Sequence, residues 1–214
     1  MRIVTLESSG EIYTSQVYLV LGCSSRLADV NTLVDVGQDP AFLKSIERAP
    51  TGVGKWPVEQ VVLTHCHSDH TALLPQVRAA FHPKVFAFSP NPGGVDCLLA
   101  DGDTVKMGDA YFDVIHMPGH SSDSVCFYNQ TEGVLFAGDS PVLTGSATAT
   151  YEAGFLVAME KLCALDVRQI YFGHGPPLME RCNERLCESY CAAAGSRLAF
   201  AKQCRNNNQA PGTA

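Results

Sequence analysis

The chain has 214 residues, of which 46% are hydrophobic and 17% are charged, a balance that suits a folded globular domain and excludes disorder throughout. The formal net charge of -7 and the absence of any run of lysine or arginine argue against nucleic acid or an anionic membrane as a partner. We therefore expect one domain over residues 1–205, followed by a flexible tail over residues 206–214.

The first part of the chain alternates strands with helices. Strands are predicted where β-branched and aromatic residues are frequent, over residues 1–7, 13–21 and 32–36. A helix is predicted over residues 40–49, since its apolar side chains recur on one side. The strand over residues 58–64 centres on the apolar run Val61-Val62-Leu63, typical of a strand buried on both faces, and a helix led by Leu73 and Leu74 follows it.

The second part begins as a meander of strands and ends in helices. After a strand over residues 84–88, short strands are predicted over residues 104–107, 111–116, 124–128 and 134–137. A helix over 151–165, a strand over 170–172 and a last helix over 179–203 complete the order. Mixed sheets covered by helices place the chain in the α/β or α+β class.

No segment has the pattern of a membrane span or a signal peptide. The longest apolar runs, such as Val17 to Leu21, are far shorter than the ~20 residues that a span requires. The N-terminus runs directly into a strand-like pattern without a separate apolar segment. We expect a cytoplasmic protein that acts on a small-molecule substrate, and a homodimer is left open.

Four candidate metal ligands, three histidines and one aspartate, are concentrated where the buried strand meets its helix. Side chains two apart in a strand point the same way, so His65 and His67 are expected to reach one ion, with Asp69 and His70 in the turn beyond. Imidazole and carboxylate suit zinc, iron and manganese. By the same alternation Cys66 faces away from the histidines, and we interpret it as a packed residue.

Three more candidates follow apolar strands directly, each beside a glycine: His120, Asp139 and His174. Ligands in open α/β sheets gather at strand ends, so residues spread from 65 to 174 can converge there. A lone histidine such as His82 is better explained as an ordinary core or surface residue. Five of seven histidines at the ends of apolar runs have no packing rationale, because buried imidazoles without partners cost free energy.

The run His65-Cys66-His67-Ser68-Asp69-His70 matches the HxHxDH signature of the metallo-β-lactamase superfamily, which the sequence resembles over roughly residues 1–178. The resemblance implies a four-layer αββα sandwich with two divalent metal ions at the sheet edges. Zinc is the first choice, with iron or manganese as alternatives. The resemblance also implies the ligands of the two ions: His65, His67 and His120 for one ion; Asp69, His70 and His174 for the other; and Asp139 as the bridge.

For several residues the sequence allows two interpretations, a role at the metal site or an ordinary structural role. Asp35 matches the family's early strand-end aspartate, which would accept a hydrogen bond from a ligand imidazole, but it also suits a turn or cap. His116 is ambiguous in the same way. The nine cysteines include Cys182, Cys187 and Cys191 in one helical pattern, which could bind metal or respond to oxidant, although buried small hydrophobes are the simpler interpretation.

The resemblance implies metal-assisted hydrolysis, with Asp69 and Asp139 as the catalytic carboxylates and Asp69 orienting the nucleophilic water or relaying its proton. His70 and Asp139 look more like glyoxalase II than like zinc lactamases, which favours a thioester or ester. Only forty residues follow His174, so we do not expect the larger helical domain that holds glutathione in glyoxalase II. Lactonases of this fold have tyrosine at the position of Val142, so the valine argues against a lactone as the substrate.

Two further alternatives come from other classes. One is an iron persulfide dioxygenase that would hold a single iron on His65, His120 and Asp139, and the other is an inactive metal-binding scaffold. Some polar residues near the ligands in sequence are candidate walls of the pocket, although ordinary polar loop residues are the better explanation: Ser121, Ser122, Ser124, Ser140, Thr144 and Tyr151.

Overall fold

The computed structural model describes residues 1–24, 26–143 and 153–194. Its first sheet has six strands in the order of the chain: β1 (Arg2–Thr5), β2 (Tyr18–Leu21), β3 (Thr32–Val34), β4 (Gln60–Val62), β5 (Lys84–Ala87) and β6 (Cys97–Leu98). β1, β2 and β3 pair antiparallel, and β3 to β6 pair parallel. Parallel neighbours bring the loops after β3, β4 and β5 to one edge of the sheet.

The second sheet has five strands in the order β11-β10-β9-β8-β7. Its members are β7 (Thr104–Met107), β8 (Ala110–His116), β9 (Val125–Asn129), β10 (Val134–Gly138) and β11 (Gln169–Phe172). β7 to β10 form an antiparallel meander, whereas β11 pairs parallel with β10. β8, β10 and β11 therefore all run in one direction and end at the same edge.

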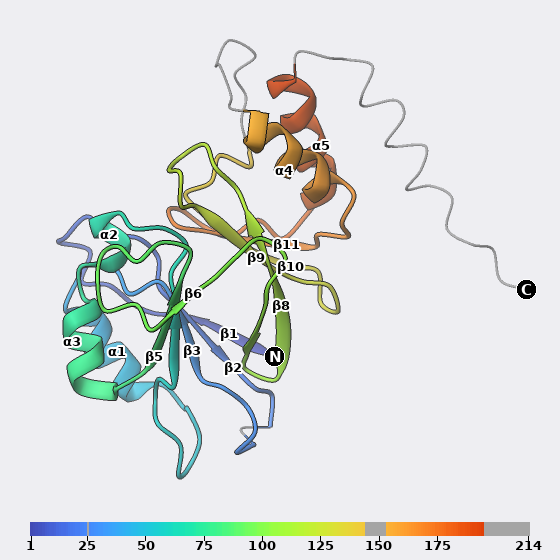
Figure 1. Cartoon of the computed structure of the whole chain (residues 1–214). Coiled ribbons are helices and arrows are strands. Elements are labelled where there is room, and N and C mark those ends of the chain that lie inside the picture. The colour runs from blue at the N-terminus through green and yellow to red at the C-terminus, as the bar shows by residue number, and fades with distance from the viewer. Residues whose placement is uncertain (25, 144–152, 195–214) are drawn as a thin grey trace, which may run out of the picture.

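Helices cover the outer face of each sheet (Figure 1). On the first sheet lie α1 (Ala41–Arg48), the single turn α2 (Ser68–Thr71) and α3 (Leu74–Phe81). On the second lie α4 (Ala153–Cys163) and α5 (Cys182–Ala193), drawn in orange and red in Figure 1. None of the helices in the described part of the chain has the length and apolar character that a membrane crossing requires.

The buried apolar residues form three layers that explain the sandwich. In β2, Leu19 and Leu21 join the cluster under α1 and α3, whereas Tyr18 and Val20 join the cluster between the two sheets. The third cluster packs β9 and β10 against α4 and α5. Strands that face apolar neighbours on both sides show continuous apolar runs, which is why Val61 and Val62 of β4 are both apolar although they join different clusters. The predicted αββα sandwich is confirmed.

One predicted strand is much shorter than expected, and one observed strand was not predicted. The strand expected over 13–21 begins only at Tyr18, because the backbone N–H groups of Ser15 and Gln16 donate to the carbonyls of Asp69 and Gly173 instead of a strand neighbour. β6, of two residues, was not predicted, since so short an element leaves no period in the sequence.

The two C-terminal helices are also shorter than predicted within the described residues. The helix expected over 151–165 covers Ala153–Cys163, and residues 151 and 152 lie outside the description. The helix expected over 179–203 covers Cys182–Ala193. Residues 195–203, and the tail predicted over 206–214, likewise lie outside the described residues.

Candidate metal centre

The histidine-rich segment leaves the first sheet at the end of β4 and enters α2. β4 ends at Val62, so His65 and His67 lie in a loop, and the prediction that they alternate along a strand was wrong. The cause is local: the backbone N–H of Thr64 donates to the carboxylate of Asp35 at 2.8 Å instead of continuing the strand. Asp69 and His70 follow within α2.

The other three candidates come from the second sheet. His120 lies in the loop after β8, Asp139 directly after β10, and His174 two residues after β11. β4, β8, β10 and β11 thus present their carboxyl ends at one edge of the sandwich. This is the convergence that the sequence predicts, although the residues span more than a hundred positions.

The seven side chains form two groups, within each of which the potential ligand atoms lie within 4.8 Å of one another: His65, His67 and His120, and Asp69, His70, Asp139 and His174. In the first group, His120 Nε2 lies 2.9 Å from His67 Nδ1. The His65 ring lies 4.5 Å from the His67 ring and 4.8 Å from the His120 ring, measured between centroids. Three imidazoles therefore face a common point.

The second group mixes imidazole and carboxylate. His174 Nε2 lies 3.0 Å from Asp69 Oδ2, and His70 Nε2 lies 3.7 Å from the same oxygen. Asp139 stands between the two groups: its Oδ1 lies 3.2 Å from His70 Nε2, and its Oδ2 lies 3.6 Å from His120 Nε2. One carboxylate therefore faces both groups, which is the position that a bridging ligand needs.

Asp35 connects the two groups, because it contacts His70 of one group directly and His65 of the other through Thr64. It is buried, and its Oδ2 accepts a hydrogen bond from His70 Nδ1 at 2.7 Å and another from the Thr64 hydroxyl at 2.8 Å. The Thr64 oxygen lies 3.1 Å from His65 Nδ1, and since it donates to Asp35 it can accept from that nitrogen. Each Nε2 is left for a cation. The geometry thus favours the ligand-orienting reading of Asp35 over the turn reading.

Asp35 also has a backbone φ of 58°, in the left-handed region. Few residues other than glycine adopt that conformation, although aspartate does so more readily than most. The strain is maintained by the carboxylate's bonds to Thr64 and His70. The side chain is thereby turned inward at the end of β3, beneath the two groups.

Buried atoms without partners show that the site fits cations. Within the described residues, five buried side-chain polar atoms have no hydrogen-bond partner: three are His65 Nε2, His70 Nε2 and Asp139 Oδ1, and the other two are the hydroxyls of Ser15 and Ser140. Such atoms are costly in a folded protein unless a ligand satisfies them. The first three belong to the two groups, and nitrogen and carboxylate oxygen are the donors that zinc and other divalent transition metals accept.

The charges of the site point the same way. Burial lowers the pKa of His65 to about 4, and repulsion from His70 adds to the effect. Burial also opposes charge on His70, but the carboxylates of Asp35 and Asp139 outweigh it and raise its pKa to about 10. Burial works against ionised Asp139, yet the neighbouring His70 imidazole, whose Nε2 lies 3.2 Å from Asp139 Oδ1, holds its pKa at about 2. The carboxylates of Asp35 and Asp139 therefore favour a positive charge on His70, and a bound cation can take its place.

Two glycines make room for this arrangement. A Cβ at Gly173 would lie 2.1 Å from Asp139 Oδ1 and 2.6 Å from the His70 ring. A Cβ at Gly138, where φ is +53°, would lie 2.6 Å from Thr64 Oγ1. Only glycine allows such close approach, so the strand ends carry glycine beside the candidate ligands.

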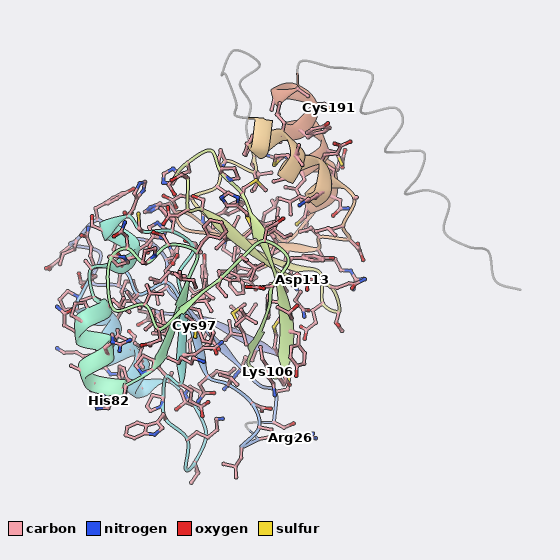
Figure 2. The ribbon with its side chains drawn as sticks, in the orientation of Figure 1. Arg26, His82, Cys97, Lys106, Asp113 and Cys191 are labelled. Atoms are coloured by element: carbon pink, nitrogen blue, oxygen red, sulfur yellow. The ribbon has the colours of Figure 1, made fainter. Side chains whose placement is uncertain are left out.

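The other histidines and cysteines that the structure describes lie outside both groups. His116 stacks on Phe88, and its Nε2 lies 2.9 Å from the carbonyl oxygen of Ser122, so it supports the loop that carries His120. His82 ends α3 and is exposed (Figure 2). Cys66 is half-buried and belongs to neither group. Cys182 and Cys187 are buried in the α4–α5 cluster, in keeping with the packing interpretation.

A cavity of about 260 Å³ opens beside Asp139 and His174, and its other lining residues are His120, Gly138, Ser140 and Phe172. Of the predicted wall residues, Ser140 therefore lines it, whereas Ser121, Ser122 and Ser124 do not, and Thr144 and Tyr151 lie outside the described residues. Sequence reasoning missed Tyr13, whose hydroxyl lies 3.3 Å from His174 Nε2. It stands in a loop and was absorbed into a predicted strand.

The family model described as the metallo-beta-lactamase superfamily matches residues 15–93, which include the histidine-rich segment. The crystal structure of BLEG-1 B3 metallo-beta-lactamase superposes with a TM-score of 0.62 and 25% identity, covering 83% of this chain and 93% of that one. Together with the fold and the seven convergent side chains, these matches define the class. The chain has the fold of the metallo-β-lactamase superfamily, and its residues 15–93 match the model of that family.

Among curated proteins, the chain is 26% identical over 162 residues to an atrochrysone carboxyl ACP thioesterase of Cryptosporiopsis sp., covering 75% of this chain and 49% of that protein. It is 32% identical over 117 residues to a hydroxyacylglutathione hydrolase of Cereibacter sphaeroides, covering 53% and 44%. The chain thus spans about half the length of these relatives.

Proposed function

We propose that this protein is a binuclear metal-dependent hydrolase that cleaves a small thioester or ester. The observation that carries the proposal is the pair of ligand groups that share one carboxylate, Asp139, with three buried ligand atoms lacking any other partner. A single structural ion would not need a second, incompletely coordinated group beside it.

His65, His67 and His120 would hold one cation, and Asp69, His70 and His174 the other, with Asp139 between them. When bound, a pair of divalent cations supplies Lewis acidity that brings the pKa of water towards neutrality and polarises a substrate carbonyl. The chain's own part is to fix the imidazoles through Asp35 and Thr64, so that little reorganisation is needed when the substrate arrives.

Asp69 is the residue best placed to move a proton. Its carboxylate is partly exposed, at 17%, and lies 3.0 Å from His174 Nε2, whereas Asp139 lies between both groups. In hydrolysis, the water oxygen bonds to the carbonyl carbon, Asp69 takes the proton, and the carbon–sulfur or carbon–oxygen bond breaks. The leaving group departs with the electron pair and receives the proton from Asp69.

Two relatives favour thioesters as the substrate class. The names of the Cryptosporiopsis and Cereibacter proteins describe an acyl-carrier-protein thioesterase and a hydroxyacylglutathione hydrolase. This chain matches only about half of each, so the groups that select their acyl carriers are not carried over. We therefore propose the bond that is cleaved and leave the carrier to experiment.

The test combines metal analysis with a substrate panel. Protein loaded with zinc, iron or manganese would be assayed with S-lactoylglutathione, an acyl-N-acetylcysteamine thioester, p-nitrophenyl acetate and a lactone. We expect two ions per chain and thioester cleavage that needs no oxygen. Asp139→Ala should lose turnover by more than about 100-fold, since even outer partners of metal ligands contribute about 10- to 100-fold.

Asp113→Ala is the matched control, because Asp113, labelled in Figure 2, is exposed on β8 and belongs to neither group. It should retain metal and activity. A single iron per chain with oxygen uptake and no thioester cleavage would instead support the persulfide dioxygenase alternative. Two ions with no turnover on any ester or thioester would contradict the proposal.

A further inference from the structure

The loop between β1 and β2 is tied to the metal-ligand rim by its backbone. The N–H of Ser15 donates to the Asp69 carbonyl at 3.1 Å, and the N–H of Gln16 donates to the Gly173 carbonyl at 2.6 Å. Gln38 adds a third attachment, since its side-chain amide donates to the carbonyl of Tyr13. Two of these bonds join the loop to Asp69, a candidate ligand, and to Gly173, the neighbour of His174. The loop is therefore held against the candidate metal centre.

These attachments place the side chain of Tyr13 directly against His174. The two rings stack with centroids 5.0 Å apart and planes 18° apart, and the phenol oxygen lies 3.3 Å from His174 Nε2. That nitrogen is the atom that faces Asp69 and Asp139. The hydroxyl of Tyr13 therefore lies beside the second ligand group, against its member His174.

Tyr13 is nevertheless 72% exposed. Packing alone does not explain an aromatic side chain that covers an imidazole with one face and leaves most of its surface to solvent. A phenol is both donor and acceptor, and once His174 Nε2 is engaged by a cation its lone pair is no longer available to the phenol hydrogen. That hydrogen is then free to point at a substrate.

We propose that Tyr13 is a catalytic residue whose hydroxyl donates a hydrogen bond to the substrate's carbonyl oxygen as negative charge develops on it. The inference rests on the proposed hydrolase function and assigns one residue to it. When the water oxygen bonds to the carbonyl carbon, the carbonyl π electrons move onto the oxygen. Tyr13 keeps its proton and stabilises that oxyanion until the bond to the leaving group breaks.

The decisive variant is Tyr13→Phe, which retains the stack on His174 and removes only the hydroxyl. We expect kcat to fall by about 100-fold, since removal of one oxyanion donor costs about 10²- to 10³-fold, with KM nearly unchanged. The fall should be equal for an activated aryl ester and an alkyl thioester, because Tyr13 does not protonate the leaving group. Metal content should stay that of the wild type.

A binding measurement gives a readout that does not depend on turnover. Phenylphosphonate carries a tetrahedral anion like the one formed on the substrate, and its affinity for the metal-loaded protein is measured by calorimetry. Tyr13→Phe should weaken it by about 10-fold, the effect of one charge-assisted hydrogen bond. Tyr111→Phe is the matched control, because Tyr111 is exposed on β8 and touches neither group.

Unchanged kcat and unchanged phosphonate affinity in Tyr13→Phe would overturn the inference. So would a loss of bound metal, which would make Tyr13 a support for the ligands, or a loss confined to poor leaving groups, which would make it a general acid. If the wild type cleaves no ester or thioester, the proposed function fails. The phosphonate comparison then still decides whether Tyr13 contacts an anion at this site.

Discussion

Four of the seven candidate ligands come from residues 65–70 in the first half of the molecule, whereas the second half supplies the other three from three separate loops. The first set is positioned by local structure, the loop after β4 and the single turn of α2. The second set is positioned only because β8, β10 and β11 end at the same edge of their sheet. Half of the centre thus depends on local chain geometry and half on packing between the sheets.

This difference has a consequence for how the site tolerates change. Asp35 and Thr64 stabilise the ligands of the first half, because Asp35 contacts His70 and Thr64 contacts His65. The ligands of the second half are held by strand ends and by glycines that leave no space for a Cβ. A substitution at Asp35 or Thr64 should lower the metal affinity in part. Loss of a ligand from either half should remove one ion.

The largest expected effect comes from removing one ligand from each half. His67→Ala should lose the ion held with His65 and His120, and His174→Ala should lose the ion held with Asp69 and His70. Each variant should bind one ion per chain by elemental analysis, with turnover reduced by more than about 100-fold. If both variants lose both ions, the two groups are one cooperative site and the comparison between halves fails.

A smaller effect is expected from Asp35→Asn. The neutral amide retains an oxygen for one hydrogen bond but removes the charge that Thr64 and His70 face, so metal affinity should fall by about 10- to 100-fold. Competition with a chromophoric chelator measures this. Asp113→Asn serves as the control for a lost surface charge, and equal affinities in the two variants would show that Asp35 has no role in holding the imidazoles.

The smallest effect separates a supporting histidine from a surface one. His116→Leu loses the contact with the Ser122 carbonyl and should lower the free energy of unfolding by about 1 kcal/mol, with metal retained. His82→Ala, at an exposed helix end, should change it by less than about 0.5 kcal/mol. Urea unfolding of the two variants decides between them. Loss of an ion in His116→Leu would place His116 among the ligands instead.

The layers and most strands could be predicted because apolar periodicity is a local property. β7 was predicted with its observed bounds, and β4 is buried on both faces as its apolar run indicates. Convergence of His65 with His174 could be predicted from the rule that ligands gather at strand ends. Tyr13 could not, because its place depends on hydrogen bonds from its loop to the Asp69 and Gly173 backbones, which leave no pattern in the sequence.

Asp35 shows an intermediate case. Its position at a strand end was visible in the sequence, but the choice between a turn and a partner for a ligand depends on a left-handed backbone and a contact with His70, 35 residues away. Similarly, the HxH pair was expected to alternate along a strand. The pair lies in a loop because Thr64 bonds to Asp35, a contact between the segments that follow β4 and β3.

Anomalous diffraction from crystals grown with zinc tests the central claim most directly. The account predicts two peaks about 3.5–4 Å apart, one among His65, His67 and His120 and one among Asp69, His70 and His174, with Asp139 touching both. A single peak, or two peaks without a shared Asp139, would contradict it.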